Sequence, residues 1–264
     1  MDHIKTISAF LVCSLELIAP PCIAQGDSLC RAPIDTVRIL EASIAPYNGM
    51  VQQSIRRKGA KKIFLGTYGK LSTGFFIGPR VLLTNAHNMH SPFGSRVIRY
   101  AGSSARAGRF HRSVSRLMDR KAVRKACWIP AAYTWNDFGN DYAIVKFPTK
   151  QPAQTTAFEL FPADSILNEC DTVFITGYPA NTKSGYDLYL AKGVVTHLNK
   201  GESTFNYTNW SETGNSGSPV WVLRNGRYLV VGIHAGTNAK GPVAKKVDKA
   251  FMDSVDAWVN LNAP

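Results

Sequence analysis

Short apolar runs separated by turn residues constrain the fold of this chain more than any other feature. The runs are rich in Val, Ile, Phe, Tyr and Thr, which favours strands over helices. They are Lys62–Tyr68, Thr73–Ile77, Val81–Thr84, Tyr142–Phe147, Thr172–Thr176, Gly193–Leu198, Pro219–Leu223 and Tyr228–His234. Because helical segments do not alternate with these runs, we expect antiparallel sheets arranged as a sandwich or as barrels.

One convincing helix is expected, at the C-terminal end. Phe251, Val255 and Val259 recur at the spacing of one helical face, and Asp248 precedes them as a suitable N-cap. The 264 residues are 45% hydrophobic and 19% charged, which is enough apolar material for a large core. This composition excludes a disordered or collagen-like chain.

The N-terminus has the pattern of an export signal. Lys5 precedes the apolar stretch Ile7–Ala19, and Ala24 completes a small-residue cleavage pattern. We therefore expect residues 1–24 to be a signal peptide and the protein to be secreted, either extracellular or periplasmic. The alternative is a buried N-terminal helix, which the prolines after Ala19 disfavour. The polar residues 25–36 precede all the strand patterns named above, and we expect them to be a short propeptide.

The cysteines indicate one disulfide in the exported protein. Of the 5 cysteines, Cys13 and Cys22 lie in the signal peptide, and Cys30, Cys127 and Cys170 remain. An odd number in an exported protein indicates one bond and one spare thiol. Because Cys30 lies in the expected propeptide, we favour the pair Cys127–Cys170.

The chain is strongly basic, with 31 Lys and Arg against 18 Asp and Glu and a net charge of +13. Much of the positive charge lies in residues 56–62 and 96–125. These clusters are either solvated surface or a patch that attracts anionic surfaces and acidic substrates. Aromatic residues are sparse there, so specific nucleic-acid binding is not expected.

Three side chains have the chemistry of a nucleophilic catalytic centre. His87 follows one strand pattern, Asp141 precedes another, and Ser216 lies in a glycine-flanked turn before a third. A serine hydroxyl is a good nucleophile when a neutral imidazole takes its proton and a carboxylate orients that imidazole. The adjacent glycines let backbone N–H groups converge on a developing oxyanion. Asp137 is an alternative to Asp141, and each side chain also has a purely structural alternative.

A metal site is the other chemistry that the histidines allow. His87 and His90 have the spacing of a ligand pair, but no cysteine or acid lies near them in the sequence to serve as a third ligand. We therefore expect neither a metal nor an organic cofactor.

Five segments occur together across residues 60–240: Thr84-Asn-Ala-His87, Asp141-Tyr-Ala-Ile-Val-Lys-Phe147, Ile175-Thr-Gly-Tyr-Pro179, Gly214-Asn-Ser-Gly-Ser-Pro-Val220 and Val231-Gly-Ile-His-Ala-Gly236. In content and order they resemble the glutamyl endopeptidase branch of the chymotrypsin-fold serine proteases. The resemblance implies an all-β fold of two antiparallel six-stranded barrels with a C-terminal helix. The chain departs from the family at Thr213, where a glycine is usual. It also lacks the cysteine that follows the catalytic histidine in the trypsin-like branch.

The resemblance implies a catalytic role for each residue of the centre. Ser216 is the nucleophile, His87 is the general base and Asp141 orients the base. The backbone N–H groups of Gly214 and Ser216 form the oxyanion hole.

It also implies a pocket for an acidic side chain. A trypsin-like pocket would carry Asp at the position of Trp210, whereas the glutamyl endopeptidase family has a hydroxyl at Ser211 and a histidine at His234. Thr237 offers a second hydroxyl, and a protonated His234 would add charge assistance to a bound carboxylate. Glu212 would oppose such a ligand if it turned inward.

We therefore expect a secreted serine endopeptidase, a monomer acting on proteins or peptides, that prefers Glu, with Asp poorer, before the scissile bond. The expected domains are residues 37–150 and 151–247, one barrel each, and the helix 248–264. Processing at the basic pairs 56–57 or 61–62 is an alternative to a mature start near residue 37. The alternative function is a catalytically silent protein of the same fold that binds an anionic partner through its basic surface.

Overall fold

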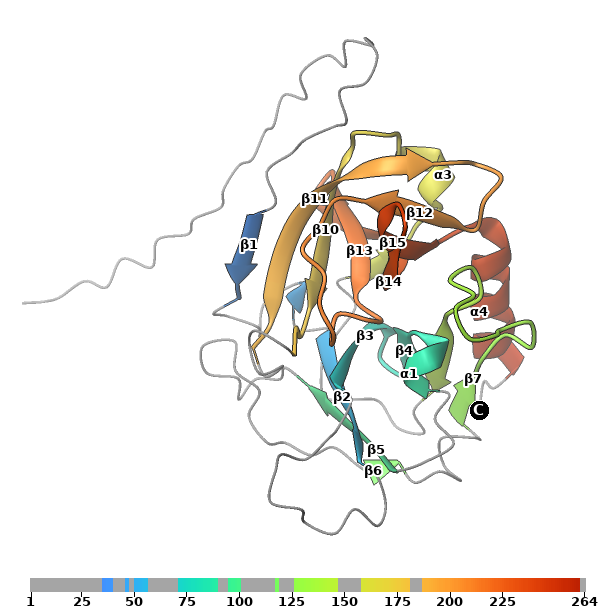
Figure 1. Ribbon diagram of the computed structural model, residues 1–264. Coiled ribbons are helices and arrows are strands. Elements are labelled where there is room, and N and C mark those ends of the chain that lie inside the picture. Colours follow the sequence, from blue (N-terminus) through green and yellow to red (C-terminus); the bar gives the residue numbers. More distant parts are fainter. Residues whose placement is uncertain are drawn as a thin grey trace, which may run out of the picture.

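The structure, a computed structural model, describes residues 35–39, 46–47, 50–56, 71–89, 95–100, 117–118, 126–146, 158–180 and 187–261. Their strands form two sheets, one from the N-terminal half of the chain and one mainly from the C-terminal half. Figure 1 shows the two sheets one above the other, with the long helix α4 (Lys249–Leu261) along one side. The expected all-β fold with a C-terminal helix is confirmed.

The C-terminal sheet closes into a barrel. Its strands are β1 (Asp35–Arg38), β9 (Phe158–Leu160), β10 (Thr172–Gly177), β11 (Tyr189–Leu198), β12 (Thr204–Tyr207), β13 (Pro219–Arg224), β14 (Arg227–Asn238) and β15 (Gly241–Lys246). Pairing runs in the order β11-β10-β13-β14-β15-β12, and β12 pairs back onto β11, which makes one closed barrel of these strands. Closure removes free edges, so this half gives a rigid support to whatever its loops carry.

The N-terminal sheet consists of β2 (Met50–Arg56), β3 (Leu71–Gly78), β4 (Val81–Thr84), β5 (Ser95–Tyr100), β6 (Leu117–Met118), β7 (Cys127–Trp128) and β8 (Ala143–Lys146). The order is β6-β5-β2-β3-β4-β8-β7, and no pairing among the described residues joins its ends. The second closed barrel therefore stays a prediction.

Every strand predicted from the sequence within the described residues is present, and Lys62–Tyr68 lies outside them. The domain boundary differs at the N-terminal end. Strand β1 pairs with β11, with Val37 opposite Leu190, so residues 35–38 belong to the C-terminal sheet. Residues 1–34 and most of the two basic clusters lie outside the described residues, so the signal peptide and the anionic surface stay predictions. Of the expected propeptide, residues 25–36, only Asp35 and Thr36 are described, and both pair with β11.

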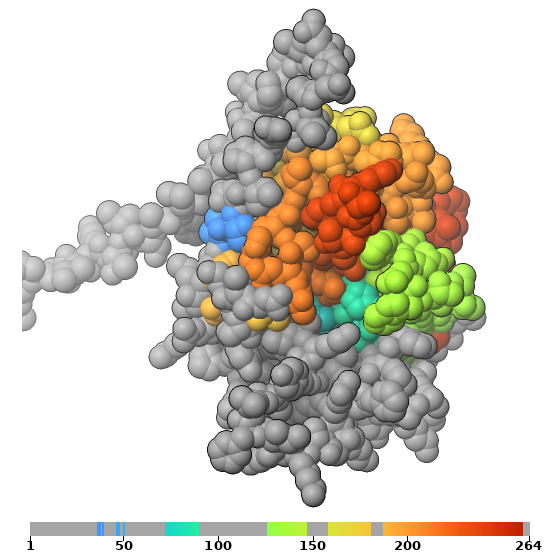
Figure 2. Space-filling view, in the orientation of Figure 1, coloured from blue at the N-terminus to red at the C-terminus, as the bar shows by residue number. Residues whose placement is uncertain are grey.

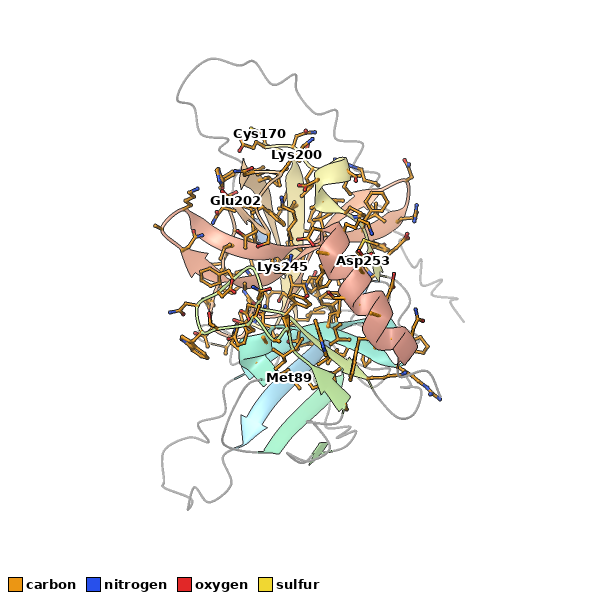
Figure 3. The ribbon with its side chains drawn as sticks, turned by 90° about the vertical axis from the view of Figure 1, so that its right-hand side faces the viewer. Met89, Cys170, Lys200, Glu202, Lys245 and Asp253 are labelled. Atoms are coloured by element: carbon orange, nitrogen blue, oxygen red, sulfur yellow. The ribbon has the colours of Figure 1, made fainter. Side chains whose placement is uncertain are left out.

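Asp248 caps α4 as predicted, because its Oδ1 atom accepts the Phe251 N–H at 2.8 Å. The buried Lys245 on β15 donates to the other oxygen of the same carboxylate at 2.5 Å. Figure 3 shows Lys245 beside the helix. Two shorter helices are α1 (Ala86–Met89) and α3 (Ala163–Ile166). No described helix is long and apolar enough to cross a membrane.

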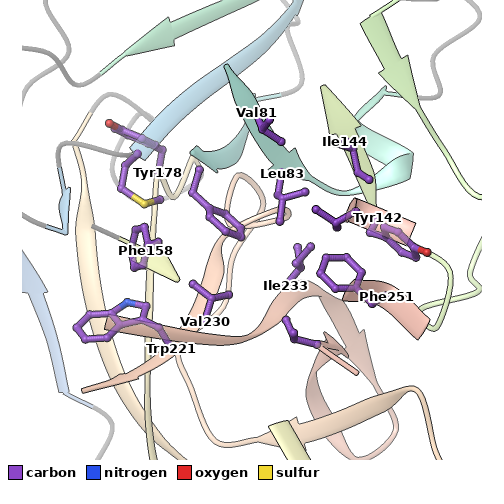
Figure 4. Packing of buried hydrophobic residues seen from close by; sticks show 14 of the residues in the cluster. Val81, Leu83, Tyr142, Ile144, Phe158, Tyr178, Trp221, Val230, Ile233 and Phe251 are labelled. Atoms are coloured by element: carbon purple, nitrogen blue, oxygen red, sulfur yellow. The ribbon is translucent and has the colours of Figure 1, made fainter. Parts of the chain in front are cut away.

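The largest apolar cluster lies where the two sheets meet (Figure 4). Leu83 from the N-terminal sheet, Ile233 from the C-terminal barrel and Phe251 from α4 all belong to it. The Phe251 ring packs edge-on against Tyr142, with 4.8 Å between ring centroids. Since Tyr142 follows Asp141 directly, α4 holds this part of the chain against the junction of the two sheets.

The predicted Cys127–Cys170 bond is wrong. Cys127 carries a thiol, and its Sγ atom lies 3.9 Å from the carbonyl oxygen of Trp128. It sits on β7 of the N-terminal sheet, whereas Cys170 lies in the turn before β10 of the barrel. Figure 3 shows Cys170 at the end of the barrel far from the N-terminal sheet. A disulfide needs Cα atoms about 4.4–6.8 Å apart, which elements on opposite ends of the molecule do not provide.

Candidate active site

Sheet pairing brings His87 and Asp141 together. The buried strand β4 leads into α1, which carries His87, and Asp141 lies two residues before β8. Because β4 and β8 are antiparallel partners, with Thr84 opposite Ala143, the end of one strand meets the start of the other.

The contact between the two residues has two points. One Asp141 oxygen lies 2.6 Å from His87 Nδ1, and the other accepts the backbone N–H of His87 at 2.9 Å. Asp141 is 3% exposed, and Asn85 fixes its backbone by donating to the Asp141 carbonyl at 2.7 Å. A carboxylate at Nδ1 holds a proton on that atom, so Nε2 is left as a proton acceptor. The contact joins the two residues that the sequence paired, and the role of His87 as a general base stays a prediction.

Asp137, the alternative carboxylate, accepts hydrogen bonds within its own loop instead. It accepts the backbone N–H groups of Gly139 and Asn140 and the Asn140 side-chain amide at 2.7–3.3 Å. These bonds shape the loop before β8. In the space-filling view, the segment 126–146 borders both residues 71–89 and the C-terminal strands (Figure 2).

The turn around Ser216 depends on two glycines. Gly214 and Gly217 have φ of +103° and +87°, and a Cβ atom there would lie 2.3 Å from the Tyr178 carbonyl and 2.1 Å from the Thr73 carbonyl. Only glycine fits both the backbone conformation and the space. The half-buried Ser216 between them precedes β13.

Two further bonds hold the peptide units whose N–H groups form the expected oxyanion hole. The Thr213 carbonyl accepts the Ala180 N–H at 2.7 Å, which fixes the peptide that carries the Gly214 N–H. The Asn215 carbonyl accepts the Ser218 N–H at 2.9 Å, which fixes the peptide that carries the Ser216 N–H. Within the described residues neither N–H of the pair donates to a backbone carbonyl. Both peptide units are held in place by these bonds, and the oxyanion hole stays a prediction.

The Ser216 turn is seated on the N-terminal sheet. The Ser216 carbonyl accepts the Thr73 N–H and the Asn88 side-chain amide, each at 2.9 Å. Asn88 follows His87 on α1, so the structure brings the turn from one sheet against the histidine helix of the other.

A second histidine lies in a chain of three side chains. His234 on β14 is 1% exposed, its Nδ1 atom is 2.6 Å from the Tyr207 hydroxyl, and its Nε2 atom is 2.7 Å from Ser211 Oγ. The sequence predicted that Ser211 and His234 act together, and the structure brings them into contact. Tyr207 on β12 was not predicted.

His234 is neutral, so it does not supply the charge assistance that a protonated ring would have added. Burial, and secondarily the charge of His87, lower the pKa of His234 to about 3. Burial also raises the pKa of Tyr207 well above its ordinary value, so its hydroxyl keeps its proton. In the described part of the chain the one acceptor recorded for that proton is His234 Nδ1. His234 then carries its own proton on Nε2 and donates to Ser211, whose hydroxyl proton is left to donate elsewhere.

The remaining predicted residues lie around this chain of contacts. Thr237 is exposed near the end of β14, and no contact with Ser211 or His234 is found for it among the described residues. Trp210 packs edge-on against Tyr189, with 6.1 Å between centroids.

Sequence reasoning also missed Trp135, which is 62% exposed and lies edge-on to the His87 ring, with 6.3 Å between centroids. Its place six residues before Asp141 is a signal that could have suggested a wall of the site.

The described ranges contain no group of three or more His, Cys, Asp or Glu side chains arranged to hold an ion, and the expectation of no metal stays a prediction. His90, the second member of the possible ligand pair, lies outside these ranges.

The family model of the trypsin-like peptidase domain matches residues 72–233, which include His87, Asp141 and Ser216. A solved structure described as "Structure of Glu endopeptidase in complex with MPD" superposes with a TM-score of 0.59. The match covers 84% of this chain and 95% of that chain at 19% sequence identity, which shows a shared fold. The chain therefore belongs to the trypsin-like peptidase family and is a serine protease with the chymotrypsin-like fold.

Proposed function

We propose that the protein hydrolyses peptide bonds through His87, Asp141 and Ser216. The observation that carries the proposal is the two-point contact between the buried Asp141 carboxylate and His87, at 2.6 and 2.9 Å. Ser216 Oγ attacks the scissile carbonyl while His87 Nε2 takes the hydroxyl proton. His87 then gives that proton to the leaving amine, and Asp141 stabilises the imidazolium in between. The N–H groups of Gly214 and Ser216 stabilise the oxyanion.

Hydrolysis of the acyl-enzyme repeats these roles. Water attacks the ester carbonyl as His87 removes its proton, and the Ser216 oxygen leaves with that proton. The chain's own side chains supply every proton transfer in this scheme.

The catalytic roles are tested by removing the reactive atoms one at a time. Ser216→Ala and His87→Ala should each lower kcat by about a millionfold, because the members of a triad act as a unit. A fluorophosphonate should label Ser216 in the wild type and fail to label either variant. Ser165→Ala, the same chemical change on the remote helix α3, is the matched control and should keep wild-type kcat. Near wild-type activity in His87→Ala would refute the proposal.

The proposed substrate preference is Glu before the scissile bond, with Asp poorer. The support is the Tyr207–His234–Ser211 chain, which leaves the Ser211 hydroxyl as a hydrogen-bond donor. A carboxylate is the strongest common acceptor for such a donor. Since His234 is neutral, the preference rests on hydrogen bonds rather than on an ion pair with the imidazole. The structural relative described as a Glu endopeptidase agrees with this preference.

Peptides that differ only in the residue before the scissile bond test the preference. Ser211→Ala should lower kcat/KM for the Glu peptide by about ten- to a hundredfold, as expected for a hydrogen bond to a charged group. The Phe peptide, which cannot use the hydroxyl, should change less than about twofold. Wild-type preference for Phe or Lys, or a Glu to Gln ratio unaffected by Ser211→Ala, would contradict the proposal.

Export and processing complete the proposed function. The pattern of residues 1–24 supports cleavage after Ala24 and release from the cytoplasm. The proposed activation step is removal of residues 25–36, which would also remove Asp35 and Thr36, the two β1 residues that pair with Lys192 and Ala191. Mass spectrometry of the mature N-terminus, together with the activity of that species, tests both steps. Full activity of a form that begins at Gln25 would refute the propeptide.

A further inference from the structure

Asn88 joins the histidine helix directly to the nucleophile turn. It is 5% exposed, and its Nδ2 atom donates to the backbone carbonyl of Ser216 at 2.9 Å. The second proton of the same amide goes to Thr84 Oγ1 at 3.0 Å, at the end of β4. Because a carbonyl can only accept, the nitrogen and not the oxygen of this amide faces Ser216.

Both acceptors of the Asn88 amide have another partner. The Ser216 carbonyl also accepts the Thr73 N–H at 2.9 Å, and the Thr84 hydroxyl donates to the Thr73 carbonyl at 2.7 Å. If the Asn88 amide were removed, each of the two acceptors would keep one hydrogen bond. The variant would therefore avoid the large loss of folding stability that follows when a buried polar group has no partner. The Ser216 carbonyl and the Thr84 hydroxyl therefore do not depend on the Asn88 amide for a hydrogen-bond partner.

What the amide adds is a second point of support for one carbonyl. The same peptide unit is also held through its N–H, because the Gly217 N–H donates to the His234 carbonyl at 2.9 Å. Of the bonds to this unit, the one from Asn88 is the one that comes from the histidine helix. Thr73 also holds the turn through its hydroxyl, which donates to the Gly214 carbonyl at 2.7 Å. The contact is close, because a Cβ atom on Gly217 would lie 3.0 Å from Asn88 Nδ2.

We infer that Asn88 is a positioning residue that fixes the nucleophile relative to the general base. His87 and Asn88 are consecutive on α1, and the carbonyl that Asn88 holds belongs to Ser216 itself. The base comes from the N-terminal sheet and the nucleophile from the C-terminal barrel, so this bond sets a distance between residues that no shared strand controls. The inference rests on the proposed roles of His87 and Ser216.

Asn88→Leu tests it, because the substitution roughly keeps the side-chain volume and removes both donors. We expect kcat to fall by about ten- to a hundredfold, the effect of displacing a reacting group by about 1 Å, with KM within about twofold of wild type. The rate of fluorophosphonate labelling at Ser216 should fall by a similar factor. Labelling needs the geometry of Ser216 and His87 but no bound peptide, so a defect in substrate binding would not change it.

Asn206→Ala is the matched control. Asn206 is 3% exposed and donates to Asn238, Gly241 and Pro242, so it loses more hydrogen bonds than Asn88 does. It contacts none of the three catalytic side chains in the described residues. We expect kcat within about twofold of wild type once the folded fraction is measured by near-UV circular dichroism.

The outcomes separate this inference from the proposed function. A wild-type protein that is not labelled at Ser216 refutes the catalytic roles themselves. If Ser216 is labelled and Asn88→Leu keeps wild-type kcat and labelling rate, only the role of Asn88 is overturned. A rise in KM at constant kcat also overturns it, and so does a loss of activity that follows the unfolded fraction equally in Asn88→Leu and Asn206→Ala.

Discussion

His87 and His234 carry the same imidazole ring, but the two rings lie in opposite surroundings. His87 has 23% of its side chain exposed, and its Nδ1 atom faces the Asp141 carboxylate at 2.6 Å. His234 is 1% exposed, and its two ring nitrogens face the hydroxyl groups of Tyr207 and Ser211. One imidazole has a negatively charged partner and is partly exposed, and the other has neutral partners and is buried.

This difference decides what each histidine can do. A carboxylate stabilises the protonated ring, which the proposed mechanism requires of His87 between the transfer of a proton from Ser216 and its delivery to the leaving group. Hydroxyl groups do not compensate the loss of water around a charge, so His234 stays neutral and keeps one tautomer. The partners of each ring, rather than the residue type, therefore separate a proton carrier from a fixed donor.

Among the tests of this contrast, the largest effect is expected from removing the charge that distinguishes His87. Asp141→Asn keeps the shape of the side chain but allows the wrong tautomer of the imidazole, and kcat should fall by about ten-thousandfold. Steady-state turnover of the Glu peptide measures it. Asp137→Asn is the control, because that carboxylate bonds within its own loop, and it should stay within a few-fold of wild type. A loss below tenfold in Asp141→Asn would remove the contrast between the two histidines.

His87 and its partner Asp141 could be predicted from the sequence, because each lies at the end of a strand pattern. The apolar run before His87 and the run after Asp141 are both recognisable, and their pairing as β4 and β8 makes the two side chains meet. The Ser216 turn was recognisable from its glycines, which the structure requires at positive φ. Local patterns and one sheet pairing were sufficient here.

The second histidine's environment was only partly predictable. Tyr207 contacts His234 from a strand, β12, that is short and follows no clear alternation. The neighbouring strand β15 was also missed, because it ends in Lys245 and Lys246, which suggest solvent. Both lysines are buried, and Lys246 is held by Asp164 at 2.8 Å and by the Asn199 carbonyl at 2.7 Å. Such pairings join distant parts of the chain, and no local pattern encodes them.

The next expected effect follows from the neutrality of His234. Its pKa is about 3 in the folded protein against 6.5 for the free side chain, so between these pH values the unfolded chain binds a proton that the folded protein does not. Folding stability from this group therefore falls as the pH falls below 6.5, by up to about 1.4 kcal/mol per pH unit. Urea unfolding at pH 7, 6, 5 and 4 measures the slope.

His234→Gln isolates this contribution, because carboxylates that also titrate in this range are common to both proteins. The wild type should lose stability more steeply than the variant as the pH falls from 6.5 to 4. Parallel curves would mean that His234 is protonated in the folded state, which would restore charge assistance in the pocket and make the two histidines alike.

The smallest expected effect concerns the tautomer of His234. Tyr207→Phe keeps the ring and removes the hydroxyl that donates to Nδ1, so the proton of His234 can move from Nε2 to Nδ1. Nε2 would then accept the Ser211 hydroxyl proton, which would no longer be available to a substrate carboxylate. We expect the preference for Glu over Phe peptides to fall by about tenfold, the equivalent of one hydrogen bond of about 1.4 kcal/mol.

Nitrogen-15 NMR of His234 reports the same change directly, since the protonated and bare ring nitrogens have well-separated shifts. Wild type should show a proton on Nε2 alone, and Tyr207→Phe should show a mixture or a proton on Nδ1. Tyr178→Phe is the matched control, because the Tyr178 hydroxyl is equally buried and has no hydrogen-bond partner in the described residues. It should leave both the peptide preference and the His234 shifts unchanged. If Tyr207→Phe also leaves both unchanged, Tyr207 does not set the tautomer, and the Ser211 hydroxyl must be oriented by another group.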